Sequence, residues 1–120
     1  MNPEMLQQKL RKEWGFNGFV ISDAGAVGGA NVRHNTSPDY ATSGKKSVEN
    51  GLDVIYQGDI HHTSLFEAPF LNGNMNPQII DSAVSRVLRI KFDLGLFENP
   101  YGQYRGIPVL DHQKIALEAA

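Results

Sequence analysis

One short apolar run, Phe19-Val20-Ile21, most strongly constrains how this 120-residue chain can fold. It lies between Gly18 and the segment Ser22-Asp23-Ala24-Gly25. An uninterrupted apolar run of this length is typical of a strand that is buried on both faces, as in a parallel sheet. In α/β folds the carboxyl ends of such strands gather the ligand-binding and catalytic groups. The pattern therefore predicts an α/β fold in which Asp23 lies at a functional strand end.

Capping residues, first-turn prolines and terminating glycines divide the rest of the chain into predicted elements. Helices are expected over residues 2–14, 39–49, 63–71, 77–94 and 112–120, and a second short strand is expected over 52–56. Pro69 argues against a regular helix at 63–71. Residues 25–38 and 98–108 are expected to be irregular, because both stretches are rich in glycine, proline and other residues typical of loops.

Asp23 is the main candidate for a functional side chain, but its spacing alone leaves several roles open. A strand-end aspartate can be catalytic, cap the next helix, start a turn, accept a phosphoryl group or bind a metal ion, and capping is the commonest use. Asp53, in the second predicted strand, is an alternative second carboxylate for the site. We favour a structural role for Asp53, because its side chain should face opposite to its strand neighbours and it precedes the strand's end.

Composition argues against several classes of partner. The formal net charge is −2 and the pI is near 6.0, so neither nucleic acid nor an anionic membrane surface is expected as a partner. There is no cysteine, and no apolar run approaches the roughly 20 residues that a membrane-spanning helix needs. His61-His62 suggests a metal site, but adjacent histidines point in different directions and no third ligand lies at zinc spacing. A surface loop or helix cap is favoured for this pair, and no metal or other cofactor is expected.

Three segments carry a resemblance to a known family. They read LRKEWGFNGFVISD over residues 10–23, AVSRVLRIKFDLGLFENPY over 83–101 and HQKIALEAA over 112–120. In this order they resemble the nucleophile segment, the closing segment of the catalytic barrel and the first helix of the second domain in glycoside hydrolase family 3. That family contains β-glucosidases and β-xylosidases. The resemblance spans nearly the whole chain.

The resemblance implies an α/β fold consisting of the last two strand–helix units of a (β/α)8 TIM barrel, plus the start of the linker to a second α/β domain. Residues 1–97 are then the C-terminal part of the barrel, and residues 98–120 are the linker and first helix leading to the second domain. The missing remainder of the barrel and the second domain are expected partners. A quarter of a barrel leaves sheet edges and helix faces uncovered, which favours self-association.

By resemblance, Asp23 is the nucleophile of a retaining β-glycosidase that removes terminal non-reducing β-linked glucose or xylose, so the expected substrate is a carbohydrate. Ala24 stands where the family often has an aromatic residue or a cysteine, and it is a candidate substrate contact. His34 is another, because β-xylosidase-like members often carry histidines in this loop. The acid/base residue is expected outside the chain, so the 120 residues alone should be inactive. Many relatives work outside the cytoplasm, which favours a secreted or periplasmic parent protein.

Two other interpretations remain open. The first is a non-catalytic truncated fragment that folds or acts only with the rest of its barrel. The second takes Asp23 as the phospho-acceptor of a signalling receiver domain. A receiver also needs an acidic pair at an earlier strand end and a lysine at a later one, and the sequence has neither.

Overall fold

The computed structural model describes residues 2–102 and 109–120, and it is built from helices. Of the described residues 59% are helical and none belongs to a strand. In chain order the elements are η1 (Glu4–Glu13), α1 (Ala26–Val32), α2 (Tyr40–Glu49), η2 (Ile60–His62), α3 (Ser64–Leu71), α4 (Pro77–Asp93) and α5 (Val109–Ala119). The predicted fold class, an α/β partial barrel with two strand–helix units, is therefore wrong for the described chain.

The two predicted strands are extended segments that share a single isolated bridge. Ile21 and Val54 form an isolated parallel bridge, with Ser22 N donating to Val54 O at 3.0 Å and Val54 N donating to Val20 O at 3.1 Å. The next rung is lost, because Tyr56 N donates to the side-chain Oγ of Ser22 at 2.9 Å. A parallel ladder grows only where carbonyl and amide groups keep pairing along both chains. The segments therefore run side by side without forming a sheet.

Most predicted helices are present, and local residues explain where they begin and end. The side chain of Asn2 accepts a hydrogen bond from Glu4 N at the start of η1, and Gly15 follows this helix with a φ of 67°. η1 is wound more loosely than an α-helix, as a π-helix. Asn76 accepts from Gln78 N at the start of α4, and Gly95 follows its end with a φ of 65°. These caps and glycines act within one or two turns, so the sequence alone reveals them.

Two expectations about helices were wrong. Residues 25–38 contain α1, although the glycine pair Gly28-Gly29 suggested an irregular connection. Gly28 is buried against the ring of Tyr40, so the missing side chain serves close packing of α1 on the start of α2. Pro69 lies inside α3 and is buried there, so it does not prevent this short helix. In the expected linker 98–108, residues 103–108 lie outside the described residues.

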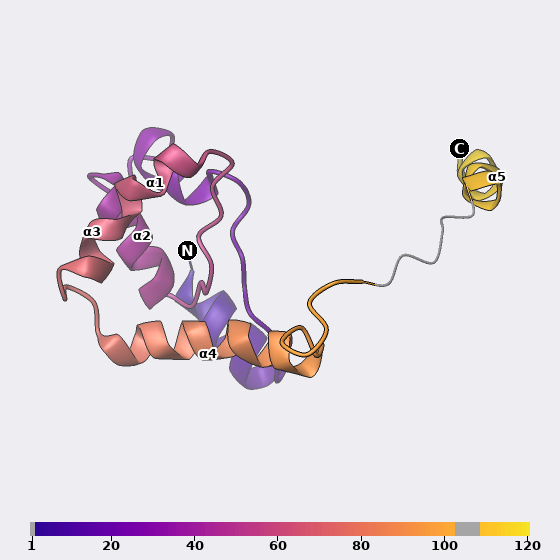
Figure 1. Cartoon of the computed structure of the whole chain (residues 1–120). Coiled ribbons are helices and arrows are strands. Elements are labelled where there is room, and N and C mark those ends of the chain that lie inside the picture. Colours follow the sequence, from indigo (N-terminus) through magenta and orange to yellow (C-terminus); the bar gives the residue numbers. More distant parts are fainter. Residues whose placement is uncertain (1, 103–108) are drawn as a thin grey trace.

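The core lies where the extended segments meet three of the helices. Val27 of α1, Leu52 and Phe66 of α3 form a buried cluster, and Tyr40 packs its ring edge-on to Phe66 with the ring centroids 5.5 Å apart. α2 contacts α1, α3 and α4. Figure 1 shows α1, α2 and α3 grouped together, α4 running along one side of this group, and α5 apart from it. The core therefore joins α1 and α3 to the ends of both extended segments.

Candidate functional site

A cavity of about 410 Å³ lies at the carboxyl end of both extended segments. Its walls come from the turn after the first segment, from α1, from the start of α2 and from the η2–α3 region. The lining residues are Asp23, Ala24, Gly25, Ala26, Gly28, Gly29, Val32, Arg33, His34, Tyr40, Gln57, His62, Leu65 and Phe66. The three residues that the sequence singled out as site candidates, Asp23, Ala24 and His34, therefore line one cavity.

Backbone hydrogen bonds fix Asp23 in the turn between the first extended segment and α1. Its Oδ1 accepts a hydrogen bond from Ala24 N at 2.7 Å, and its carbonyl accepts one from Ala26 N at 3.1 Å. Gly25 has a φ of 70°, in the left-handed region that glycine adopts without strain. Gly25 N also donates to Tyr56 O at 3.2 Å, which ties the turn to the second segment. Asp23 itself is exposed to the cavity side of this turn, where a ligand can reach it.

Asp23 is the only acidic residue among those that line the cavity. Arg33, His34 and His62 supply basic groups, while Tyr40, Leu65 and Phe66 supply an apolar wall. A single carboxylate can act as a nucleophile, but acid–base chemistry with two carboxyl groups needs a second acidic residue. The described residues thus provide one half of such a pair at this cavity.

Gln57 and His62 line the cavity although the sequence did not assign them to the site. Gln57 follows the second extended segment much as Asp23 follows the first. The strand-end argument that pointed to Asp23 would therefore have identified Gln57 as well, had it been applied to the second segment. The pair His61-His62 was expected on a surface loop or helix cap, and both residues lie exposed in the short helix η2. The approach of His62 to α1 depends on how α3 packs on α2, and no local signal in the sequence reveals it.

Asp53 does not line the cavity. Its side chain is 0% exposed and is bound by Arg11 and Arg86, so the structural role that the sequence favoured agrees with its surroundings. Among the described residues, no group of three or more histidine, cysteine, aspartate or glutamate side chains is placed to hold a metal ion. In the same part of the chain, none of the helices has the length and apolar character needed to cross a membrane.

Comparison with known families assigns the chain. The family model described as "Glycosyl hydrolase family 3 N terminal domain" matches residues 1–90. The chain belongs to glycosyl hydrolase family 3. The resemblance inferred from the sequence motifs is therefore confirmed. The matched residues of the family 3 domain include Asp23 and the whole lining of the cavity.

Relatives within family 3 carry the names of β-xylosidases and β-glucosidases. The putative β-xylosidase of Formosa agariphila is 37% identical over 100 residues, which cover 83% of this chain and 13% of that protein. The xylan 1,4-β-xylosidase of Xylanibacter ruminicola is 38% identical over 96 residues, covering 80% of this chain and 11% of that protein. The crystal structure of the β-glucosidase from Listeria innocua in complex with isofagomine matches with a TM-score of 0.71 at 33% identity.

The match to the Listeria innocua β-glucosidase covers 89% of this chain and 14% of that chain. This chain thus spans a small part of the length of the family 3 proteins that it matches, between 11% and 14% for the three described here.

Proposed function

We propose that this chain is the segment of a retaining β-glycosidase that supplies the nucleophile, Asp23. The parent enzyme hydrolyses terminal non-reducing β-linked glucose or xylose from glycosides and oligosaccharides. The observation that carries this proposal is the position of Asp23, the one acidic side chain on the wall of a cavity in a family 3 domain. The names of the relatives, β-xylosidase and β-glucosidase, support the substrate class.

The expected reaction has two steps. The carboxylate of Asp23 attacks the anomeric carbon of the sugar, and the bond to the leaving oxygen breaks as a second carboxyl group gives that oxygen a proton. Water then attacks the covalent glycosyl-enzyme, transfers a proton to the second carboxylate and releases the sugar with its original anomeric configuration. The bond from Ala24 N to Oδ1 orients the carboxylate, and Oδ2 is the oxygen that we assign to the attack.

In this two-carboxyl mechanism the proton donor comes from outside the described cavity wall, because no other lining residue carries a carboxyl group. We therefore assign residues 1–97 to the C-terminal part of the family's catalytic domain, and residues 98–120 to the linker and first helix of the following domain. Ala24 and His34 are proposed substrate contacts, since both line the cavity with Asp23. In this proposal the remainder of the parent protein completes the site and covers the apolar surfaces that this chain leaves exposed.

Exchange into a complete family member tests the proposal directly. We would replace the matching stretch of the Listeria innocua β-glucosidase with these residues and confirm folding by circular dichroism and gel filtration. The chimera would then be treated with 2-fluoro glucosyl and 2-fluoro xylosyl donors, which accumulate the covalent intermediate, and analysed by intact mass and peptide mapping. A covalent adduct on Asp23 is expected, and the donor accepted identifies the sugar.

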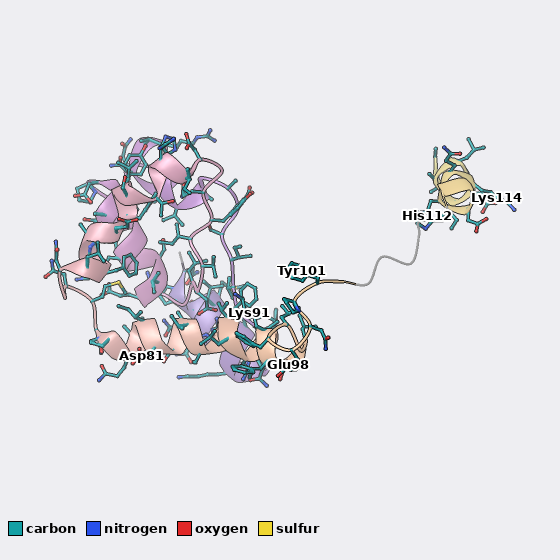
Figure 2. All side chains as sticks on the ribbon, viewed as in Figure 1. Asp81, Lys91, Glu98, Tyr101, His112 and Lys114 are labelled. Atoms are coloured by element: carbon teal, nitrogen blue, oxygen red, sulfur yellow. The ribbon has the colours of Figure 1, made fainter. Side chains whose placement is uncertain are left out.

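Two variants of the chimera sharpen this experiment. Asp23→Asn should form no adduct, while Asp81→Asn should react like the parent chimera, because Asp81 lies on α4 (Figure 2) and does not line the cavity. A folded chimera that gives no adduct on Asp23 would overturn the proposal. It would favour the alternative, a non-catalytic fragment.

The dependence on the remainder of the protein has its own test. The purified 120-residue chain should not release nitrophenol from aryl β-glucosides or β-xylosides above the buffer rate, since it offers only one carboxylate at the cavity. Turnover by the chain alone, lost on Asp23→Asn, would contradict the assignment of the acid/base residue to another part of the protein.

A further inference from the structure

Two hydrogen bonds hold the residue before Gln57 against the turn that carries Asp23. The residue before it, Tyr56, donates from its N to Ser22 Oγ at 2.9 Å and accepts from Gly25 N at 3.2 Å. These two bonds attach the start of Gln57 to the residues that flank Asp23 in sequence. The carboxamide is thus carried by a fixed stretch of backbone, in contrast to His34 and His62, whose side chains are exposed.

The carboxamide of Gln57 contains a buried donor that no acceptor satisfies. Its Nε2 is buried and has no hydrogen-bond partner among the described residues. Buried polar groups in proteins are almost always paired, so each exception points to strain or to a role in binding. The side chain lines the same cavity as Asp23, Leu65 and Phe66, and it also lines a smaller cavity of about 140 Å³. Because Nε2 is buried beneath the cavity wall, the side chain must turn toward the cavity before a ligand there can supply the missing acceptor.

We propose that Gln57 is a specificity-determining residue, whose carboxamide hydrogen-bonds a hydroxyl group of the sugar that reacts with Asp23. The inference rests on the proposed function of the chain. Each sugar hydroxyl can both donate and accept, and a carboxamide offers both complements without carrying a charge. A neutral partner also holds a hydroxyl beside the Asp23 carboxylate without forming an ion pair with the nucleophile. The site should therefore favour sugars that carry this hydroxyl over sugars that lack it, because a sugar without it leaves the carboxamide unpaired.

The decisive variant is Gln57→Met, which keeps the length of the side chain and removes its hydrogen-bonding atoms. In the β-glucosidase chimera we expect kcat/KM for the preferred aryl β-glycoside to fall about 10- to 100-fold, or about 1.4–2.7 kcal/mol. The melting temperature should stay the same or rise, since the variant removes a buried unpaired donor. Gln8→Met, on an exposed position of η1, is the matched control and should change neither quantity.

A series of aryl glycosides that each lack one hydroxyl identifies the contact. For the deoxy sugar that lacks the contacted hydroxyl, kcat/KM of the variant and of the parent chimera should differ less than about threefold. For the other sugars the full loss of kcat/KM should persist. An equal loss of kcat/KM for every sugar would assign Gln57 a purely structural role, and so would a loss of kcat/KM accompanied by a fall in melting temperature. Unchanged kcat/KM for every sugar would also overturn the inference.

Trapping with the 2-fluoro donors separates this inference from the proposed function. The Gln57→Met chimera should still form an adduct on Asp23, only more slowly, because the nucleophile is intact. Adduct formation on Asp23 together with no selective effect of Gln57→Met rejects the inference about Gln57 and leaves the proposed function standing. Absence of the adduct in the folded parent chimera rejects the proposed function, and the inference with it.

Discussion

Arg86 donates two hydrogen bonds to one carboxylate oxygen of Asp53, from Nε at 2.8 Å and from Nη2 at 2.6 Å to Oδ1. The other oxygen, Oδ2, accepts from Arg11 Nη2 and, at 2.8 Å, from Val20 N. One buried carboxylate thereby joins η1, the first extended segment and α4. Because Val20 leads directly to the turn that holds Asp23, this junction fixes the segment that carries the proposed nucleophile.

When Asp53 is replaced, the chain should unfold at a much lower urea concentration. Asp53→Ala leaves two arginine side chains and a backbone amide without their acceptor, and removal of one partner from a buried ion pair costs about 3–5 kcal/mol. Urea unfolding of the 120-residue chain, followed by circular dichroism, measures the free energy of unfolding. Asp81→Ala, at an exposed position of α4, should change it by less than about 0.5 kcal/mol. Equal effects of the two variants would show that the junction contributes nothing to stability.

Arg86 and Arg89 provide a second comparison on a single helix. Arg86 binds the buried Asp53, while Arg89 is exposed one turn further along α4. Arg86→Lys should weaken the junction by more than 1 kcal/mol, since a lysine cannot present two nitrogens to Oδ1 in the fixed geometry of a guanidinium. Arg89→Lys should leave the free energy of unfolding unchanged. The same urea titration distinguishes them, and a neutral Arg86→Lys variant would show that charge alone is sufficient at this position.

The two neighbouring glycines of α1 should respond to alanine in opposite directions. A Cβ on Gly28 would lie 2.7 Å from the ring of Tyr40, whereas a Cβ on Gly29 meets nothing closer than 3.9 Å. Gly28→Ala should destabilise the fold by about 1–3 kcal/mol through overpacking. Gly29→Ala should stabilise it by about 0.5–1 kcal/mol, because alanine loses less backbone entropy in a helix. Thermal unfolding of both variants checks the sign, and destabilisation by Gly29→Ala would contradict the helical packing described for α1.

Phe66 and Leu65 are adjacent in α3 but face different surroundings. Both line the cavity, but Phe66 is 4% exposed and belongs to the central cluster, while Leu65 is 43% exposed. Phe66→Ala should cost about 3–5 kcal/mol, since it empties the centre of the core and removes the edge-on contact with Tyr40. Leu65→Ala should cost less than about 1 kcal/mol. A similar loss for both would mean that the core is not centred on Phe66.

Asp39 should make stability depend on pH at the acidic end. Its Oδ1 accepts from Thr42 N at 2.6 Å at the start of α2, and this backbone hydrogen bond, with a further one from the Thr42 side chain, lowers the pKa of Asp39 below its ordinary value of 3.8. Since the folded pKa is the lower one, the stabilisation is complete above about pH 3.8 and is lost as the pH falls through the folded pKa.

Two measurements check this expectation. An NMR titration of the Asp39 carboxyl carbon should give a midpoint below 3.8. Asp39→Asn keeps a capping side chain that does not titrate. The difference in urea midpoint between the parent chain and this variant should therefore be constant above pH 3.8 and change below it. A midpoint at or above 3.8 would contradict the assigned hydrogen bonds.

The sequence by itself determined the local features of this protein. Asn76 with Pro77 marks the start of α4 and Gly95 follows its end, because caps and terminating glycines act through backbone groups one turn away. The sequence motifs also identified the family, and the strand-end argument pointed to Asp23, which does line the cavity. Its role as nucleophile remains a prediction for the adduct experiment to test.

Only the tertiary structure decided which distant groups meet. The extended segments form one bridge and no sheet, because Tyr56 N pairs with the Ser22 hydroxyl and the ladder needs continuous backbone pairing. Asp53 finds its arginines 33 and 42 residues away in the chain, and the cavity wall combines Asp23 with Gln57 through packing of α1 and α3 on α2. Such pairings depend on burial and geometry across the whole fold, and no local pattern of residues encodes them.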